Sequence, residues 1–296
     1  HEAAGEVVEI GHGVSHLQVG DRVAIAPLVP CLDCQFCQQG MYSLCTSYSF
    51  IGSRQQGCMA EYVSVPSRCL LKIPKELSYE KAALVEPATV SLHILLRVAV
   101  AGSRVVVLGT GTIGLLAVQW AKFLGAAQVI AVDIDDFKLE IAKQTGADVV
   151  LNSRQGTRET LAQLKEATCG HMADIVVETA GKAITQVQSI EMAASSGNVL
   201  YVGTAEKDVH VPARTFEMIL RKELTILGSW MSYSPPFPGK EWSMAIEALA
   251  QGRIKVEKLI THRFGIDEAV TALEVMRDGV NTVKVMLLCS QQKQDT

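Results

Sequence analysis

Four of the chain's eight cysteines, Cys31, Cys34, Cys37 and Cys45, fall within fifteen residues, separated by two, two and seven residues. Thiolates at this spacing can converge on one ion, and four of them complete a tetrahedral zinc shell. An iron–sulfur cluster is the nearest alternative because it also takes four thiolates, whereas disulfide frameworks suit small secreted domains. A closed four-sulfur shell has no free position, so the predicted zinc is structural and the chemistry lies elsewhere. We expect the other cysteines to be reduced packing residues: Cys58, Cys69, Cys169 and Cys289.

A glycine-rich turn follows the β-branched run at residues 105–108 and leads into a segment of helical period. Strand, turn and helix together are the context that a dinucleotide fingerprint requires. The helix amino terminus would offer unpaired amides and a positive dipole end to a pyrophosphate. The candidate residues here are Gly109, Gly111, Thr112, Ile113 and Gly114.

A second β-branched run, residues 128–133, ends in Asp133. A carboxylate there can accept hydrogen bonds from both adenosine-ribose hydroxyls and would repel a 2′-phosphate, so NAD is favoured over NADP. Lys138 could contact the same ribose, or it is an exposed helix lysine without a ligand role.

Strand-like and helix-like segments continue to alternate as far as residue 228, which predicts a doubly wound parallel sheet, the Rossmann arrangement. Ligands of such sheets bind at the carboxyl ends of the strands, so later strand ends are candidates for the nicotinamide side. A domain that binds another nucleotide, or none, is the alternative. The candidates are Val202, Gly203, Thr204 and Ser229.

Residues 1–88 differ, since short strand-like runs, at residues 21–27, 58–66 and 69–74, are separated by Gly and Pro and little helical period precedes Ser78. We predict a β-rich catalytic domain at 1–88, a nucleotide domain at 89–228 and a segment at 229–296 that returns to complete the first domain. The net charge of −4 and the absence of a dense Lys/Arg run argue against nucleic-acid and membrane partners. The uncharged and largely apolar stretch at residues 105–121 is too short to span a bilayer, which takes about 20 apolar residues.

The opening stretch HEAAGEVVEIGHGV resembles the signature of the zinc-dependent medium-chain alcohol and polyol dehydrogenases. The four-cysteine loop resembles their structural zinc lobe, and the glycine turn with Asp133 resembles their NAD site. The resemblance covers nearly the whole chain and implies a GroES-like fold for the β-rich domain. Three further stretches, YSFIGSR, LVEPATVSLH and LRKELTILGSWMSYSPPFPGKEW, are similar to members that act on galactitol 1-phosphate or sorbitol.

The resemblance implies a second, catalytic zinc held by His1, Glu86 and a cysteine of the family pattern that the printed sequence does not contain. Glu2 is similar to a further carboxylate that ligates the metal or positions its water. A zinc with an open position lowers the pKa of an alcohol oxygen and holds it beside the nicotinamide. With two of the family's ligands, we expect the printed chain by itself to be inactive or nearly so.

The function that we expect is hydride transfer between NAD and a polyol or polyol phosphate, in a cytoplasmic homodimer or homotetramer. The alternatives are an enzyme similar to L-threonine 3-dehydrogenase and a non-catalytic NAD-binding protein. Arg54 could pair with a substrate phosphate. The candidate pocket residues, each of which could equally be a packing residue, are Phe50, Ser53, Trp230, Met231 and Tyr233.

Overall fold

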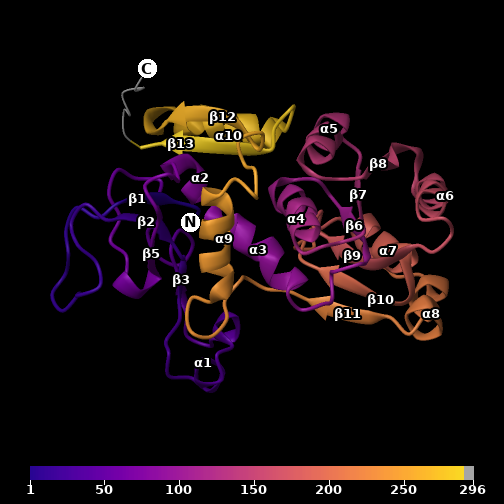
Figure 1. The fold of residues 1–296 in the computed structure, drawn as a ribbon, viewed down its shortest axis with the longest axis horizontal. Coiled ribbons are helices and arrows are strands. Elements are labelled where there is room, and N and C mark those ends of the chain that lie inside the picture. The colour runs from indigo at the N-terminus through magenta and orange to yellow at the C-terminus, as the bar shows by residue number, and fades with distance from the viewer. Residues whose placement is uncertain (290–296) are drawn as a thin grey trace. The chain divides into compact units, whose positions relative to one another are not determined.

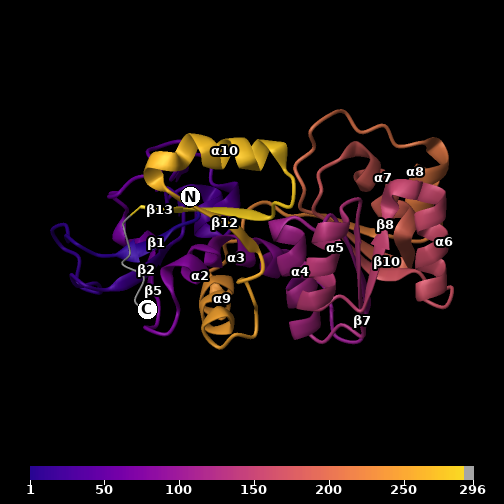
Figure 2. The same ribbon diagram turned by 90° about the horizontal axis from the view of Figure 1, so that it is seen from above.

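The structure is a computed structural model that describes residues 1–289. The chain divides into two compact units. One unit contains His1–Thr89 together with the chain from Met231 onward, and the other is Val90–Trp230. Figures 1 and 2 show the first unit in indigo and purple, with its part after residue 230 in orange to yellow, and the second unit in magenta to orange.

A six-stranded parallel sheet forms the centre of the Val90–Trp230 unit, in the order β11-β10-β9-β6-β7-β8. Val105, Val106 and Val107 of β6 are fully buried, as expected of a strand covered on both faces. The chain order reverses between β9 and β6, which makes the carboxyl end of β6 the switch point of the sheet. The strands are β6 (Arg104–Leu108), β7 (Gln128–Asp133), β8 (Val149–Asn152), β9 (Ala173–Glu178), β10 (Ala193–Tyr201) and β11 (Thr225–Gly228).

Helices connect these strands on both faces of the sheet (Figures 1 and 2). Helices α4 and α5 pack together, and α7 packs against both α6 and α8. Because such crossovers are right-handed and the strand order reverses at the switch point, the helices of the two halves of the sheet cover opposite faces. The doubly wound Rossmann sheet predicted from the sequence is therefore confirmed. The helices are α4 (Thr112–Phe123), α5 (Asp136–Thr145), α6 (Thr157–Ala167), α7 (Ala183–Met192) and α8 (Ala213–Arg221), with a short 3-10 helix at Ser153–Gln155.

The other unit is built from short strands. Strands β1, β2 and β5 form an antiparallel sheet, and β3 pairs with β4. The Ser78 side chain accepts a hydrogen bond from the Lys81 amide and so begins α2. The elements are β1 (Ala4–Glu6), β2 (Arg22–Ile25), β3 (Leu28–Val29), α1 (Gln35–Gln38), β4 (Ser49–Phe50), β5 (Leu70–Lys72) and α2 (Tyr79–Ala83), with 3-10 helices at Tyr42–Leu44 and Ser67–Cys69. Helix α3 (Val85–Leu95) begins in this unit and continues past Thr89 into the other.

The C-terminal part of this unit contains α9 (Lys240–Ala250), β12 (Ile260–Gly265), α10 (Ala269–Asp278) and β13 (Lys284–Leu288), with a 3-10 helix at Ile266–Glu268. Strands β12 and β13 are parallel, and α10 packs on both of them. The Trp242 side chain on α9 is fully buried and its indole nitrogen donates to the Ser232 carbonyl oxygen.

One strand expected from the sequence does not form. Residues 58–66, which read as a β run, are irregular, and Met59 and Tyr62 are 68% and 74% exposed. A strand needs a neighbour for its backbone groups, and the structure pairs no described strand with this segment. In the residues that the structure describes, no helix is both long and apolar enough to cross a bilayer.

Candidate functional site

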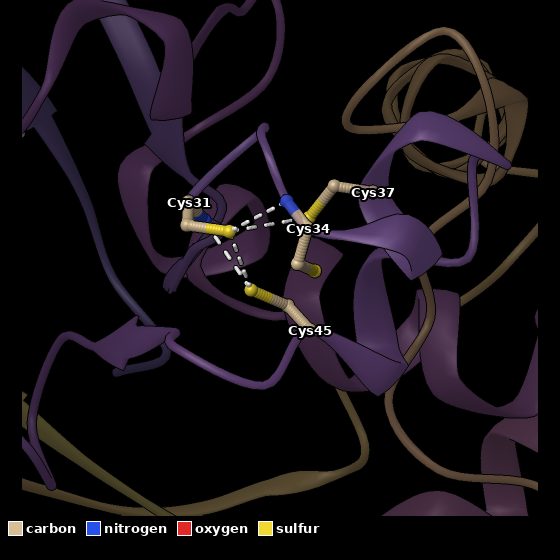
Figure 3. Close-up of side chains that lie close together, drawn as sticks. All are labelled: Cys31, Cys34, Cys37 and Cys45. Carbon is tan, nitrogen blue, oxygen red and sulfur yellow. Dashed lines mark hydrogen bonds between the residues drawn. The ribbon is translucent and has the colours of Figure 1, made fainter.

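The four clustered cysteines converge on one point (Figure 3). Their sulfur atoms all lie within 4.8 Å of one another, with 3.4 Å between Cys45 and Cys31 and 3.9 Å between Cys31 and Cys37. These separations are far too long for a disulfide, and each cysteine is a free thiol. A cage of four converging sulfurs fits a tetrahedral zinc ion. The convergence predicted from the spacing is therefore present.

Backbone amides assist this cluster. The Cys34 amide donates to the Cys31 sulfur and the Cys31 amide to the Cys45 sulfur, each over 3.3 Å (Figure 3). Backbone hydrogen bonds from Cys37 and Thr46 lower the pKa of the Cys34 thiol to about 6, whereas burial raises the pKa of Cys37 to about 12. A cation that neutralises the thiolates would remove the cost of ionising the buried one.

A second group of possible metal ligands consists of His1, Glu2 and Glu86, whose ligand atoms lie within 4.8 Å of one another. The Nδ1 atom of His1 lies 3.5 Å from Oε1 of Glu86, and the imidazole and the Phe50 ring form a T-shaped pair. Glu86 occupies the first turn of α3, and its carbonyl oxygen accepts a hydrogen bond from the Thr89 hydroxyl. Nitrogen and oxygen donors in this mixture suit zinc, so the residues fit a second ion.

Lys284, which sequence reasoning did not single out, also belongs to this group. Its ammonium forms an ion pair with the Glu2 carboxylate, and only 18% of its side chain is exposed. Burial lowers the pKa of Lys284 to about 8. The sequence feature that could have pointed to Lys284 is a single lysine at the start of an otherwise apolar strand.

The glycine-rich turn lies between β6 and α4, at the switch point of the sheet. A Cβ atom on Gly114 would stand 1.8 Å from the Gly109 carbonyl oxygen, so only glycine allows the helix to approach the strand this closely. Gly109 itself has a φ of +90°, which favours glycine. Gly111 precedes the helix, and a Cβ there would meet nothing within 4 Å. Thr112 and Ile113 begin α4, and the amides of a helix's first turn point outward along its axis. The turn fits a pyrophosphate.

Asp133 ends β7 beside this turn. Its Oδ2 atom accepts from the amide and hydroxyl of Thr110, at 2.6 and 2.9 Å, and Oδ1 accepts from the amides of Ile134 and Asp135. Lys138 forms an ion pair with Asp135 at 3.7 Å. The carboxylate is thus fixed at the strand end predicted for a ribose ligand.

The loops after β9 and β10 contact one another. A Cβ atom on Gly181 would stand 2.2 Å from the Thr204 carbonyl oxygen, and one on Gly203 would stand 2.4 Å from the Gly181 amide. The amides of Val202 and Gly203 both donate to the Glu178 carbonyl oxygen. Three of the predicted nicotinamide residues, Val202, Gly203 and Thr204, thus lie at one strand end.

Two buried oxygens at these strand ends have no hydrogen-bond partner among the described residues, Oγ of Ser229 and Oε2 of Glu178. The other oxygen of Glu178 accepts from the amides of Ala180 and Gly181 and from the Thr185 hydroxyl. Burial raises the pKa of Glu178 despite these bonds. Glu178 was not predicted as a site residue, although the sequence shows an acidic residue directly after an apolar, strand-like run. Orphaned polar atoms of this kind are compatible with a polar ligand.

The candidate pocket residues have different surroundings. The Tyr233 ring stacks on Phe237 and Trp242, and its hydroxyl oxygen accepts from the Leu28 amide, so Tyr233 belongs to the core. Trp230 is 56% exposed, Ser53 is exposed, and Met231 is partly buried with a φ of +61°.

Arg54 donates to the hydroxyl and carbonyl oxygens of Tyr48 and stacks on its ring. A phosphate bound by Arg54 would therefore compete with Tyr48 for the guanidinium.

Of the remaining cysteines, Cys69 is fully buried, and Cys58 and Cys289 are partly buried. Cys169 was expected to pack, and that expectation is wrong. It is exposed and has a φ of +50° just beyond the end of α6, where the chain leaves the helix in the left-handed region.

Two family models match the chain. Residues 1–75 match the alcohol dehydrogenase GroES-like domain, and residues 112–251 match the zinc-binding dehydrogenase model. A galactitol 1-phosphate 5-dehydrogenase of Escherichia coli (strain K12) is 38% identical over 289 residues, which are 97% of this chain and 83% of that protein. A sorbitol dehydrogenase of Gallus gallus is 35% identical over 297 residues, 100% of this chain and 81% of its own.

Solved structures of similar proteins superpose closely. Galactitol-1-phosphate dehydrogenase from Escherichia coli gives a TM-score of 0.88 at 40% identity, over 94% of this chain and 81% of that one. A structure from Sinorhizobium meliloti 1021, described as a zinc-binding dehydrogenase bound to NADP, gives 0.89 at 32% identity, over 98% and 82%.

Proposed function

Because the chain belongs to the family of zinc-dependent medium-chain alcohol dehydrogenases, we propose that it transfers a hydride between NAD and a secondary alcohol of a polyol or polyol phosphate. The observation that carries the proposal is the convergence of His1, Glu2 and Glu86 within 4.8 Å. A closed four-sulfur cage cannot also supply an open metal position. The second group, with its nitrogen and oxygen donors, can.

In this proposal His1 and Glu86 hold the catalytic zinc, and Glu2 lies beside it. When bound, the zinc lowers the pKa of an alcohol hydroxyl and stabilises its developing negative charge, and the dinucleotide accepts the hydride. The four cysteines hold a second zinc that stabilises their loop. A reducing compartment such as the cytoplasm, where thiols remain available to a metal, suits such a protein.

The dinucleotide is assigned to the turn before α4. Amides at the start of α4 would hold the pyrophosphate, and the glycines let it approach the backbone closely. Asp133 would hold the ribose hydroxyls, which must share its oxygens with the amides of Ile134 and Asp135. An anion at this position disfavours a 2′-phosphate, which supports NAD. Val202, Gly203, Thr204 and Ser229 would line the nicotinamide, and Lys138 would contact the ribose.

Metal analysis combined with a hydride-transfer assay tests the proposal. We expect two zinc ions per chain, and NADH formation with galactitol 1-phosphate or sorbitol that exceeds formation with L-threonine. One zinc ion, bound dinucleotide and no turnover would instead indicate a non-catalytic NAD-binding protein. Preferential oxidation of threonine would favour the threonine dehydrogenase alternative.

Because the printed chain has two of the family's zinc ligands, we expect this turnover to be very slow or close to background, and a fast rate would contradict that expectation. Size-exclusion chromatography with light scattering measures the oligomeric state, for which a homodimer or homotetramer is the prediction.

A further inference from the structure

Lys284 lies in an unusual place for a lysine. It begins β13, an otherwise apolar strand, and its ammonium reaches Glu2 from 282 positions away in the sequence. The exposed fractions of the two side chains are 18% and 26%. A charge this far from water needs a partner, and each of the two provides one for the other.

Glu2 could instead give its charge to a metal. Its carboxylate belongs to the same group as His1 and Glu86, with ligand atoms within 4.8 Å. Among the described residues, Glu2 forms an ion pair with Lys284, and Glu86 forms one with His1. A divalent ion and the Lys284 ammonium would therefore compete for the Glu2 carboxylate. Partners of this kind orient potential ligands and tune the affinity of the site.

We propose that Lys284 is a positioning residue that holds Glu2 beside the catalytic metal and keeps it from becoming a permanent ligand. The inference rests on the proposed function, since it requires a metal at the second group of ligands. By holding Glu2, Lys284 leaves one coordination position of the metal available to substrate. It also adds a positive charge near the metal, so the metal binds less tightly than the donors alone would allow.

The proposal makes an unusual prediction for removal of the lysine. In Lys284→Met the Glu2 carboxylate loses its partner, and the metal becomes the remaining cation that can neutralise it. Metal affinity at the second group should rise, by about tenfold, the scale on which such outer partners act. If Lys284 only supports the fold, the same substitution lowers the affinity or leaves it unchanged.

The experiment uses the full chain and cobalt(II) as the probe. One equivalent of zinc fills the four-sulfur site first, and cobalt(II) is then titrated into the second group while its visible absorption is recorded. In Lys284→Met we expect tighter binding and a weaker band, since an added ligand moves cobalt away from tetrahedral geometry. Lys284→Arg keeps the charge and should restore both. Lys72→Met removes an ion pair with Asp21 in the same unit and serves as the matched control.

A double variant removes the ambiguity of a folding defect. Glu2→Gln with Lys284→Met buries neither charge, and its cobalt affinity should return toward that of the wild type. A folded Lys284→Met with unchanged or weaker affinity, in a wild type that binds two metals, overturns this inference alone. A wild type that binds one metal overturns the proposed function and the inference with it.

Discussion

The two units of this protein position their functional residues in different ways. In the Val90–Trp230 unit, strands of four to nine residues form one continuous buried sheet, and the candidate residues follow the strand ends. In the other unit the strands have two to six residues and form three small sheets. There the candidate residues are clustered thiols and charged groups. The Val90–Trp230 unit gains its order from the apolar burial of its sheet, whereas the other unit combines apolar packing with a cysteine cluster and ion pairs between distant segments.

The strongest test of this contrast is removal of the sulfur cage. Cys37→Ser should lose one zinc ion and destabilise its own unit by at least about 5 kcal/mol, since structural zinc sites in isolated peptides contribute about 10–16 kcal/mol. Hydrogen exchange should accelerate around residues 31–45 and leave β6 protected. Cys58→Ser, outside the cluster, is the matched control. Retention of both zinc ions in Cys37→Ser would contradict the cage.

The second test concerns close packing in the sheet unit. In Gly114→Ala the new methyl group meets the Gly109 carbonyl oxygen, and we expect a loss of about 3 kcal/mol in the free energy of unfolding. Gly111→Ala has open space, so its stability should stay within about 0.5 kcal/mol of wild type while dinucleotide affinity falls. Urea unfolding and fluorescence titration with NADH measure the two quantities. Equal stability losses in both variants would refute this division of roles.

A smaller effect is expected from Asp133→Asn, which removes the negative charge beside the proposed ribose site. The ratio of NADH to NADPH affinity should fall by roughly tenfold, because repulsion of the 2′-phosphate is lost. The amide oxygen of the variant can accept from Thr110 or from the amides of Ile134 and Asp135, so the urea midpoint is measured alongside to show that the turn remains folded. An unchanged ratio would show that Asp133 does not select the cofactor.

The smallest effect concerns an ion pair between the first residue of β6 and β9. Partial burial raises the pKa of Asp174, but hydrogen bonds from the side chain and amide of Arg104 outweigh it, so the folded pKa is lowered. The pair therefore stabilises the protein above the unfolded pKa of about 3.9 and stops doing so as pH falls through the folded value. Because 38% of the Asp174 side chain is exposed, we expect a contribution of about 0.5 kcal/mol.

Urea midpoints of wild type and Asp174→Asn at pH 7 and near pH 3 measure this term. The difference between the two proteins should shrink in acid. A difference that grows as the pH falls would reverse the assigned sign.

The sequence by itself determined the features whose residues are neighbours along the chain. Four cysteines within fifteen residues must form a local cluster, and glycines between an apolar strand and a helix must form a tight turn. Short loops leave such groups little freedom to separate, so spacing alone predicts their geometry. Alternating strand and helix periods likewise predicted the doubly wound sheet.

Only the tertiary structure decided what lies far apart in sequence. His1 and Glu86 were paired from a family resemblance, and the residues between them do not predict that pairing. The ion pair of Glu2 with Lys284 and the unpaired buried oxygen of Glu178 were not predicted, and the sequence left open whether Tyr233 packs or binds. Each depends on which segments meet once apolar surface is buried. Hydrophobic burial is non-directional, so it gives no sign in the sequence of which polar side chains it will bring together.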